Sequence, residues 1–253
     1  MNRLQLVRTT GILFITLVVL LNVPYALLIQ NFEYDDILRQ PVDSVLTKFH
    51  AGGVGLILTW FVFAVAALLF IPASTFLYKI INSEDTPLLT AATAMGVLSG
   101  ILQSVGLMRW VFVVPILANL YTNPTAGTAT REAVSVVYQA VHQYGGVVIG
   151  EYLGQTLLVF WTLGVGIAIR RSPLFKSWVA WLGLMTVPLL ILGQSELLAT
   201  VISPMPVLEA TPVGFILWEV WLFVIGISLL RVPRQRVIRD KLKAMKSCKN
   251  VQV

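Results

Sequence analysis

The sequence predicts an all-α, polytopic membrane protein: one bundle of six transmembrane helices, with both the N-terminus and the C-terminus in the cytoplasm. Of its 253 residues, 57% are hydrophobic and only 12% are charged, and the mean hydropathy is +0.83. A soluble globular chain has roughly a quarter of its residues charged. The other two observations are six long apolar segments and an uneven distribution of Lys and Arg between the ends of those segments.

Each apolar segment is long enough to cross a bilayer, which takes about 20 helical residues. The first follows a charged start that resembles a signal peptide, but no A-x-A cleavage site follows it, so we expect an uncleaved helix. Because the connections are short, we expect a single transmembrane domain over residues 1–253. The six segments span residues 9–29, 51–73, 88–115, 146–169, 178–200 and 211–230.

The third and fourth segments extend further than a bilayer requires. The apolar pattern that begins at Leu88 continues to Tyr121, and the pattern of the fourth segment can begin well before residue 146. Either these two helices project together beyond the outer face, or Pro115 and the Gly145-Gly146 pair break them near the interface. The sequence leaves both alternatives open.

The positions of Lys and Arg set the predicted orientation. With the N-terminus inside, fourteen basic residues lie on the inner side and three on the outer side. Cytoplasmic segments of membrane proteins carry such an excess. The outer three are Arg39, Lys48 and Arg131; the inner ones are Arg3, Arg8, Lys79, Arg170, Arg171, Lys176 and eight in the tail.

The basic cytoplasmic tail, residues 231–253, accounts for the net charge of +6. It holds eight Lys and Arg and one acid, whereas the rest of the chain has ten basic and eleven acidic residues. Because the basicity is local, no nucleic-acid partner is expected, and the tail is predicted to contact anionic lipid head groups of the plasma membrane. The i, i+4, i+7 spacing of Ile238, Leu242 and Met245 is compatible with a short interfacial helix, but a solvated tail that only fixes orientation is the preferred interpretation. The single cysteine, Cys248, excludes an intramolecular disulfide.

Ionisable residues inside the apolar segments are the main functional observation. Each costs roughly 2.5 to 3.5 kcal/mol at membrane depth, so such residues normally face the bundle interior and pair with one another. The topology places them toward the outer side of four helices, which predicts a polar pocket that opens outward. The candidate ligand-binding residues are Arg109, Glu151, His142, His50 and Glu196, with Gln103, Trp110, Tyr144 and Gln155, as well as Gln143 and Gln194, as further lining.

Rows of small residues predict which helices approach closely. Gly146, Gly150 and Gly154 form an i+4 row on the fourth helix, and His142 lies one turn before it. A second row lies on the third helix, and rows of this kind let helix backbones come together. The members of the second row are Ala92, Gly96, Gly100 and Ser104.

Arg109 and Glu151 are predicted to lie within salt-bridge reach, and a purely structural role for that pair remains open. Glu196 can equally be a residue at a helix end in the water interface. His50 and His142 can be ordinary interfacial histidines. Glu219, near mid-depth in the sixth helix, can be protonated and hydrogen-bonded in the core.

Recognisable catalytic and metal-binding motifs are missing from the sequence. It has no HExxH, its two histidines are 92 positions apart, and no GxSxG occurs. We therefore expect no metal and no cofactor, and repeats typical of transporters are not evident. The first hypothesis is a protein that binds, senses or translocates a small molecule or lipid. The alternatives are an intramembrane enzyme that acts on a lipid or isoprenoid head group, with a His and a Glu as its base, and a structural subunit.

Two stretches carry a family resemblance: GLMRWVFVVPILANLY at 106–121 and HQYGGVVIGEYLGQTLLVFWTL at 142–163. They resemble the core of a bacterial multi-pass membrane family, domain of unknown function 4386, and NFEYDDILRQP at 31–41 and GFILWEVWLFVIGISLL at 214–230 resemble its first outer loop and last helix. The resemblance implies the fold class but no activity. It implies that His142 stands where relatives commonly have Asn, which leaves Arg109 and Glu151 as the better shared element. The signature positions that it implies are Arg109, Trp110, Pro115, Tyr144, Gly150, Glu151, Gly154 and Trp161.

Overall fold

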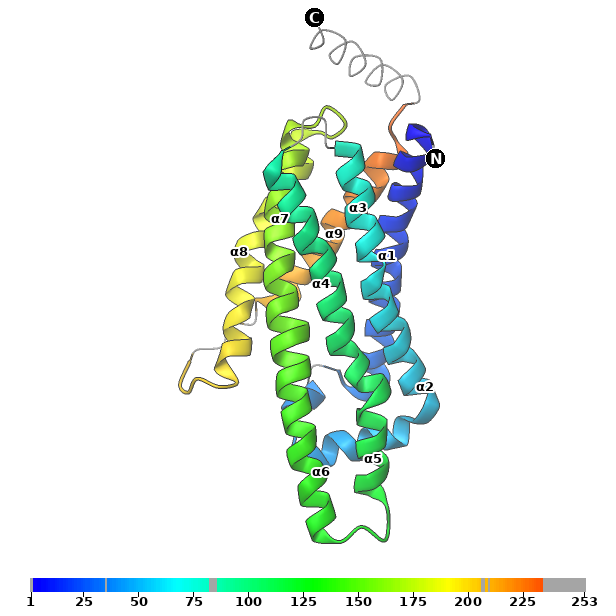
Figure 1. The fold of residues 1–253 in the computed structure, drawn as a ribbon, viewed down its shortest axis with the longest axis vertical. Helices are drawn as coiled ribbons and strands as arrows, with labels where there is room; N and C mark the ends of the chain where they lie inside the picture. Colours follow the sequence, from blue (N-terminus) through cyan, green and yellow to red (C-terminus); the bar gives the residue numbers. More distant parts are fainter. Residues whose placement is uncertain (1, 35, 82–85, 206–207, 209, 234–253) are drawn as a thin grey trace, which may run out of the picture.

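The computed structural model describes residues 2–34, 36–81, 86–205, 208 and 210–233, and this part of the chain contains helices and connections but no strand. Six helical spans are long and apolar enough to cross a membrane, which confirms the predicted all-α bundle (Figure 1). The spans are Arg3–Phe32, Val42–Ile81, Pro87–Thr122, Thr128–Arg171, Ser177–Ala199 and Thr211–Leu230.

Three of the spans are divided into shorter elements, and three are single helices. The single helices are α1 (Arg3–Phe32), α8 (Ser177–Ala199) and α9 (Thr211–Leu230). The second span comprises α2 (Val42–Leu68) and α3 (Phe70–Ile81), and the third comprises α4 (Pro87–Phe112) and α5 (Val114–Thr122). The fourth comprises α6 (Thr128–Val141), the π-helix η2 (His142–Leu153) and α7 (Gly154–Arg171); the short 3-10 helix η1 (Asp36–Arg39) precedes α2.

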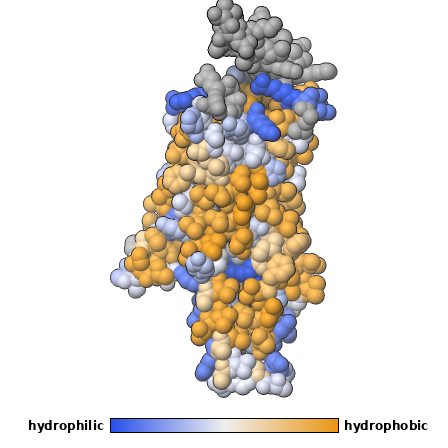
Figure 2. Space-filling view, in the orientation of Figure 1, coloured by the Kyte–Doolittle hydropathy of each residue, from blue (hydrophilic) through white to orange (hydrophobic). Residues whose placement is uncertain are grey.

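The start of α1 and the end of α9 lie at the same end of the bundle (Figure 1). There the two backbones touch, since a Cβ added to Gly11 would lie 2.9 Å from the carbonyl oxygen of Gly226. We call this the terminal end and the opposite one the distal end. Figure 2 shows an apolar band over most of the visible face, with hydrophilic residues toward the terminal end and also around the distal end. Which side of the membrane each end faces stays a prediction.

The third and fourth spans project beyond the other helices at the distal end, where α5 and α6 form a pair (Figure 1). Pro115 lies in the first turn of α5, where proline is tolerated. The third span is therefore interrupted only at Val113, between α4 and α5. Gly145 and Gly146 lie inside η2 and do not end the fourth span. Of the two alternatives, the projecting pair is the one observed.

A bend at Gly53 divides α2. Its backbone has φ 55° and ψ −149°, a conformation that is essentially restricted to glycine. Before the bend, residues 42–52 run across the distal part of the bundle instead of along it (Figure 1). The buried face of this crossing segment consists of Val45, Leu46 and Phe49.

The buried apolar residues form two clusters, one in each half of the bundle. The terminal cluster contains Trp161, Trp218 and Trp221. The distal cluster contains Phe32, Phe49, Trp60, Trp110 and Tyr138. Of the basic tail, only residues 231–233 are described, so the candidate interfacial helix and Cys248 lie outside the described residues.

Candidate functional site

The glycine row of the fourth span lies against α4. A Cβ added to Gly106 on α4 would lie 2.4 Å from the Cα atom of Gly150, so the two backbones are in direct contact. A Cβ on Gly154 would lie 2.7 Å from the Gln103 side chain. The row predicted on the third helix divides between neighbours: Gly96 faces Trp161 of α7, and Gly100 faces the α2–α3 junction.

Arg109 is held on this contact face and is only 6% exposed. Its Nη1 donates a hydrogen bond of 2.6 Å to the carbonyl oxygen of Gly106. Its Cζ lies 5.3 Å from the ring centroid of Trp110. A Cβ on Gly146 would lie 2.4 Å from Cζ, so the absence of a side chain at Gly146 makes room for the guanidinium.

Glu151 on η2 approaches the same guanidinium. The distance from Arg109 Nη2 to Glu151 Oε1 is 3.6 Å, which confirms that the two residues lie within salt-bridge reach. This distance exceeds that of a good hydrogen bond, so the contact is an ion pair. The Glu151 side chain is 30% exposed whereas that of Arg109 is 6% exposed, so the acid lies at the edge of the site and the guanidinium lies inside it. π-Helical segments such as η2 are frequent at functional sites.

Stacked rings pack beside the guanidinium. Trp60 and Trp110 stack with their centroids 4.8 Å apart and their planes 10° apart. Phe49 of the crossing segment stacks on Trp110, with a centroid distance of 5.6 Å. Tyr138 and His142 stack at 5.6 Å, and His142 meets Trp110 edge-on at 6.3 Å. The structure thus joins α2, α4, α6 and η2 through one aromatic cluster, Phe49, Trp60, Trp110, Tyr138 and His142.

Four buried nitrogens at this cluster have no hydrogen-bond partner within the part of the chain that the structure describes: Trp60 Nε1, Trp110 Nε1, Arg109 Nε and His142 Nδ1. Burying an N–H group without a partner costs about 1–3 kcal/mol, so native structures rarely leave several in one place. We call these atoms, with their side chains, the donor site, because the first three can only donate.

The buried tryptophans of the terminal cluster behave differently. Trp161 Nε1 donates to Ser74 Oγ at 2.8 Å. Trp218 Nε1 donates to Thr162 Oγ1 at 2.9 Å, and Trp221 Nε1 donates to the carbonyl oxygen of Val179 at 2.7 Å. Partnerless indoles are therefore not a general feature of this bundle but are confined, among these five tryptophans, to the donor site.

Comparison with known proteins gives the family. The model of the family described as Domain of unknown function (DUF4386) matches residues 9–226. The chain belongs to the DUF4386 family. The match extends from within α1 to within α9 and includes every residue of the donor site. No curated protein and no solved structure matches this DUF4386 chain.

Three predicted site residues of this DUF4386 protein are not part of the donor site. Glu196 accepts a hydrogen bond of 2.6 Å from Arg39 of η1. His50 Nδ1 lies 2.9 Å from Asn119 Oδ1 on α5. Tyr144 is 67% exposed.

The predicted glutamines connect helices. Gln103 Nε2 donates to Ser99 Oγ at 2.8 Å, and that hydroxyl donates to the carbonyl oxygen of Gly154 at 2.7 Å. Gln155, 8% exposed, accepts a hydrogen bond of 3.0 Å from Gln194 of α8. Gln143 Nε2 donates to Thr200 Oγ1 at 2.9 Å. In the sixth span, Glu219 accepts a hydrogen bond of 2.9 Å from Asn22 of α1.

Three residues of the aromatic cluster are not predicted from the sequence: Trp60, Phe49 and Tyr138. Nothing distinguishes Trp60 from the other apolar residues of its segment. The i+4 spacing of Tyr138 and His142 is the one local signal that could have brought Tyr138 into the site. Among the described residues, no group of three or more His, Cys, Asp and Glu side chains is placed to hold a metal ion.

Proposed function

We propose that this DUF4386 protein binds a small molecule or lipid at the donor site, in the distal half of the bundle, and acts as a binding, sensing or permease-type protein of a bacterial plasma membrane. The observation that carries the proposal is the group of partnerless N–H donors of Trp60, Trp110 and Arg109. A ligand that accepts hydrogen bonds from them removes the cost of their burial.

The charges at the site indicate a neutral accepting group. Glu151 lies beside Arg109 and already supplies one negative charge. A second anion would repel that carboxylate in a region of low dielectric constant. A carbonyl, ether or hydroxyl oxygen satisfies the donors without this repulsion, and the flat faces of the aromatic cluster suit an apolar body attached to such an oxygen.

The crossing segment covers the donor site from the distal end. Phe49 stacks on Trp110, and Gly53 supplies the bend on which the position of this segment depends. We infer that the ligand enters when residues 42–52 move away. The excess of Lys and Arg at the terminal end of the bundle predicts that this entrance, at the distal end, opens to the outside of the cell.

The test is native mass spectrometry of the full chain purified from its membrane in mild detergent. The variant Trp110→Phe keeps the aromatic ring but removes one donor. Trp218→Phe is the matched control, because its indole already has Thr162 as a partner. The proposal predicts a bound species in wild type and in the control that is lost or strongly reduced in Trp110→Phe. Equal occupancy in all three proteins, or no bound species in wild type, would contradict it.

A further inference from the structure

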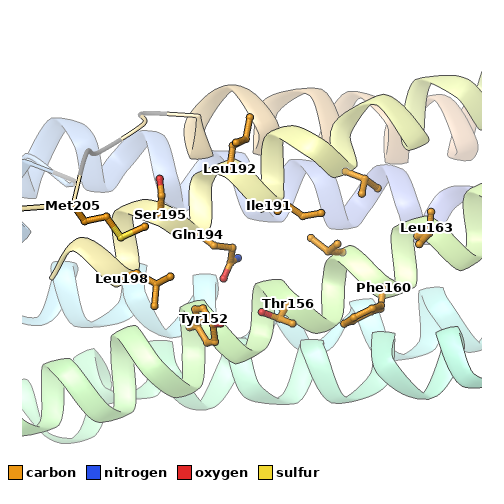
Figure 3. Close-up of a pocket in the computed structure, with 12 residues that line it drawn as sticks. Tyr152, Thr156, Phe160, Leu163, Ile191, Leu192, Gln194, Ser195, Leu198 and Met205 are labelled. Carbon is orange, nitrogen blue, oxygen red and sulfur yellow. The ribbon is translucent and has the colours of Figure 1, made fainter. Parts of the chain in front are cut away.

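A groove runs along the outer surface of the bundle between α7 and α8. Its cavity volume is about 470 Å³, within the range of sites that hold small molecules. Phe160 and Leu163 of α7 and Ile191 of α8 are among its walls (Figure 3). These side chains are 48%, 39% and 54% exposed, respectively. Because both helices are membrane spans, the groove faces the hydrocarbon of the bilayer.

The polarity of the groove changes along the helix axes. Leu163 lies toward the terminal end of the groove, whereas Gln194 and Ser195 lie toward the distal end, beside Leu198 and Met205 (Figure 3). Gln194 lies five residues before the last residue of α8, Ala199, which is about 8 Å at the rise of an α-helix. The polar half therefore lies near the boundary between hydrocarbon and head groups, and the apolar half extends toward the membrane centre. The head group and the hydrocarbon chains of a lipid are arranged in the same order.

Two polar atoms of residues that line the distal half of the groove are buried without a hydrogen-bond partner among the described residues. They are Gln194 Oε1 and Ser195 Oγ. The amide nitrogen of Gln194 donates to Gln155 Oε1 at 3.0 Å, so its oxygen is left as an acceptor. A ligand that satisfies this oxygen must carry a hydrogen-bond donor such as an ammonium or hydroxyl group.

We propose that the α7–α8 groove binds one membrane phospholipid, with a hydrocarbon chain along Phe160, Leu163 and Ile191 and a donor of the head group on Gln194 Oε1. The groove shares no lining residue with the donor site. This proposal therefore does not depend on the proposed function. The ligands also differ in chemistry: the groove requires a donor from its ligand, and the donor site requires an acceptor.

The test compares two lipids with the same pair of acyl chains. Phosphatidylethanolamine and phosphatidylcholine are both zwitterionic, but only the ethanolamine ammonium can donate a hydrogen bond. The delipidated full chain is titrated with each lipid in detergent, and the bound fraction is measured by native mass spectrometry. We expect one site that favours phosphatidylethanolamine by roughly three- to tenfold, the range of one hydrogen bond. Equal binding of the two lipids, or no site that retains a lipid, overturns the proposal.

Variants separate the two parts of the groove. Gln194→Leu is expected to remove the preference between the lipids, whereas Gln139→Leu, at an exposed position on α6, keeps it. Ile191→Trp fills the apolar half from an exposed position, so it is expected to lower the binding of both lipids without loss of folding. Unchanged binding in Ile191→Trp, or an unchanged preference in folded Gln194→Leu, would contradict the proposed position of the lipid.

Discussion

The contact between Gly106 and Gly150 holds the donor site together, and replacing Gly106 tests this directly. In Gly106→Ala, the new Cβ would lie 2.4 Å from Gly150 Cα. Carbon atoms pack best at about 3.5–4.0 Å, so α4 and η2 must separate by about 1 Å or more. That separation also lengthens the contact of 3.6 Å between Arg109 and Glu151.

The energetic cost follows from two opposing effects. Overpacking costs about 1–3 kcal/mol, and the upper end applies because the obstacle is a backbone atom rather than a flexible side chain. Alanine in a helix recovers about 1 kcal/mol relative to glycine. The expected net loss for Gly106→Ala is thus about 2 kcal/mol. Gly145→Ala is the matched control, because its Cβ would meet nothing within 4 Å, and it is expected to gain up to about 1 kcal/mol.

The assay is thermal unfolding of both variants in the same detergent, followed by tryptophan fluorescence. A difference of about 3 kcal/mol between the variants corresponds to unfolding midpoints roughly 6–12 °C apart in a chain of this size, with Gly106→Ala the lower. Equal midpoints, or a higher midpoint for Gly106→Ala, would refute the close contact between α4 and η2.

Three further substitutions test other parts of the structure. Gly53→Ala forces alanine into a positive-φ conformation and should lower the free energy of chemical unfolding by about 1–3 kcal/mol. Gly55→Ala, which has open space around its Cβ, should not lower it. Equal free energies of unfolding for the two variants would exclude the bend at Gly53. Glu151→Gln leaves the buried guanidinium without its counter-charge and should lower the thermal midpoint by the equivalent of about 1–3 kcal/mol; full stability with loss of a measured activity would instead favour the enzyme alternative. Glu196→Gln breaks the ion pair with Arg39, whose side chains are 28% and 54% exposed, respectively. The free energy of unfolding should therefore fall by less than about 1 kcal/mol. A larger fall would contradict the small contribution that we expect from this exposed pair.

The helices and part of the site could be predicted because membrane physics restricts the alternatives. A span needs about 20 apolar residues whatever the tertiary structure, so composition alone locates it. An isolated charge at membrane depth is costly, and Arg109 and Glu151 were the strongest candidates to pair. Glycines four residues apart indicated that the fourth span approaches a neighbouring helix closely, because few other sequence patterns let two backbones touch; the partner, Gly106 of α4, belongs to no such row.

The rest of the site depends on tertiary structure that the sequence does not encode locally. Gly53 bends α2, so Phe49 lies over Trp110, but a glycine in an apolar segment can equally stay helical. In η2 the hydrogen bonds run from i to i+5, which changes the angular positions that a sequence analysis assigns on an α-helix. Glu196 pairs with Arg39 because of where the η1 segment folds back, and no pattern near either residue indicates that position.

An experimental structure at high resolution, determined on protein extracted from its native membrane into nanodiscs, would show directly whether the donor site holds a ligand. We expect non-protein density within hydrogen-bond distance of Trp110 Nε1 and Arg109 Nε, shaped as a molecule larger than water and reached from the side of residues 42–52. Density for an isolated water only, or side-chain acceptors of the chain itself on both nitrogens, would contradict the claim that the donor site binds a ligand.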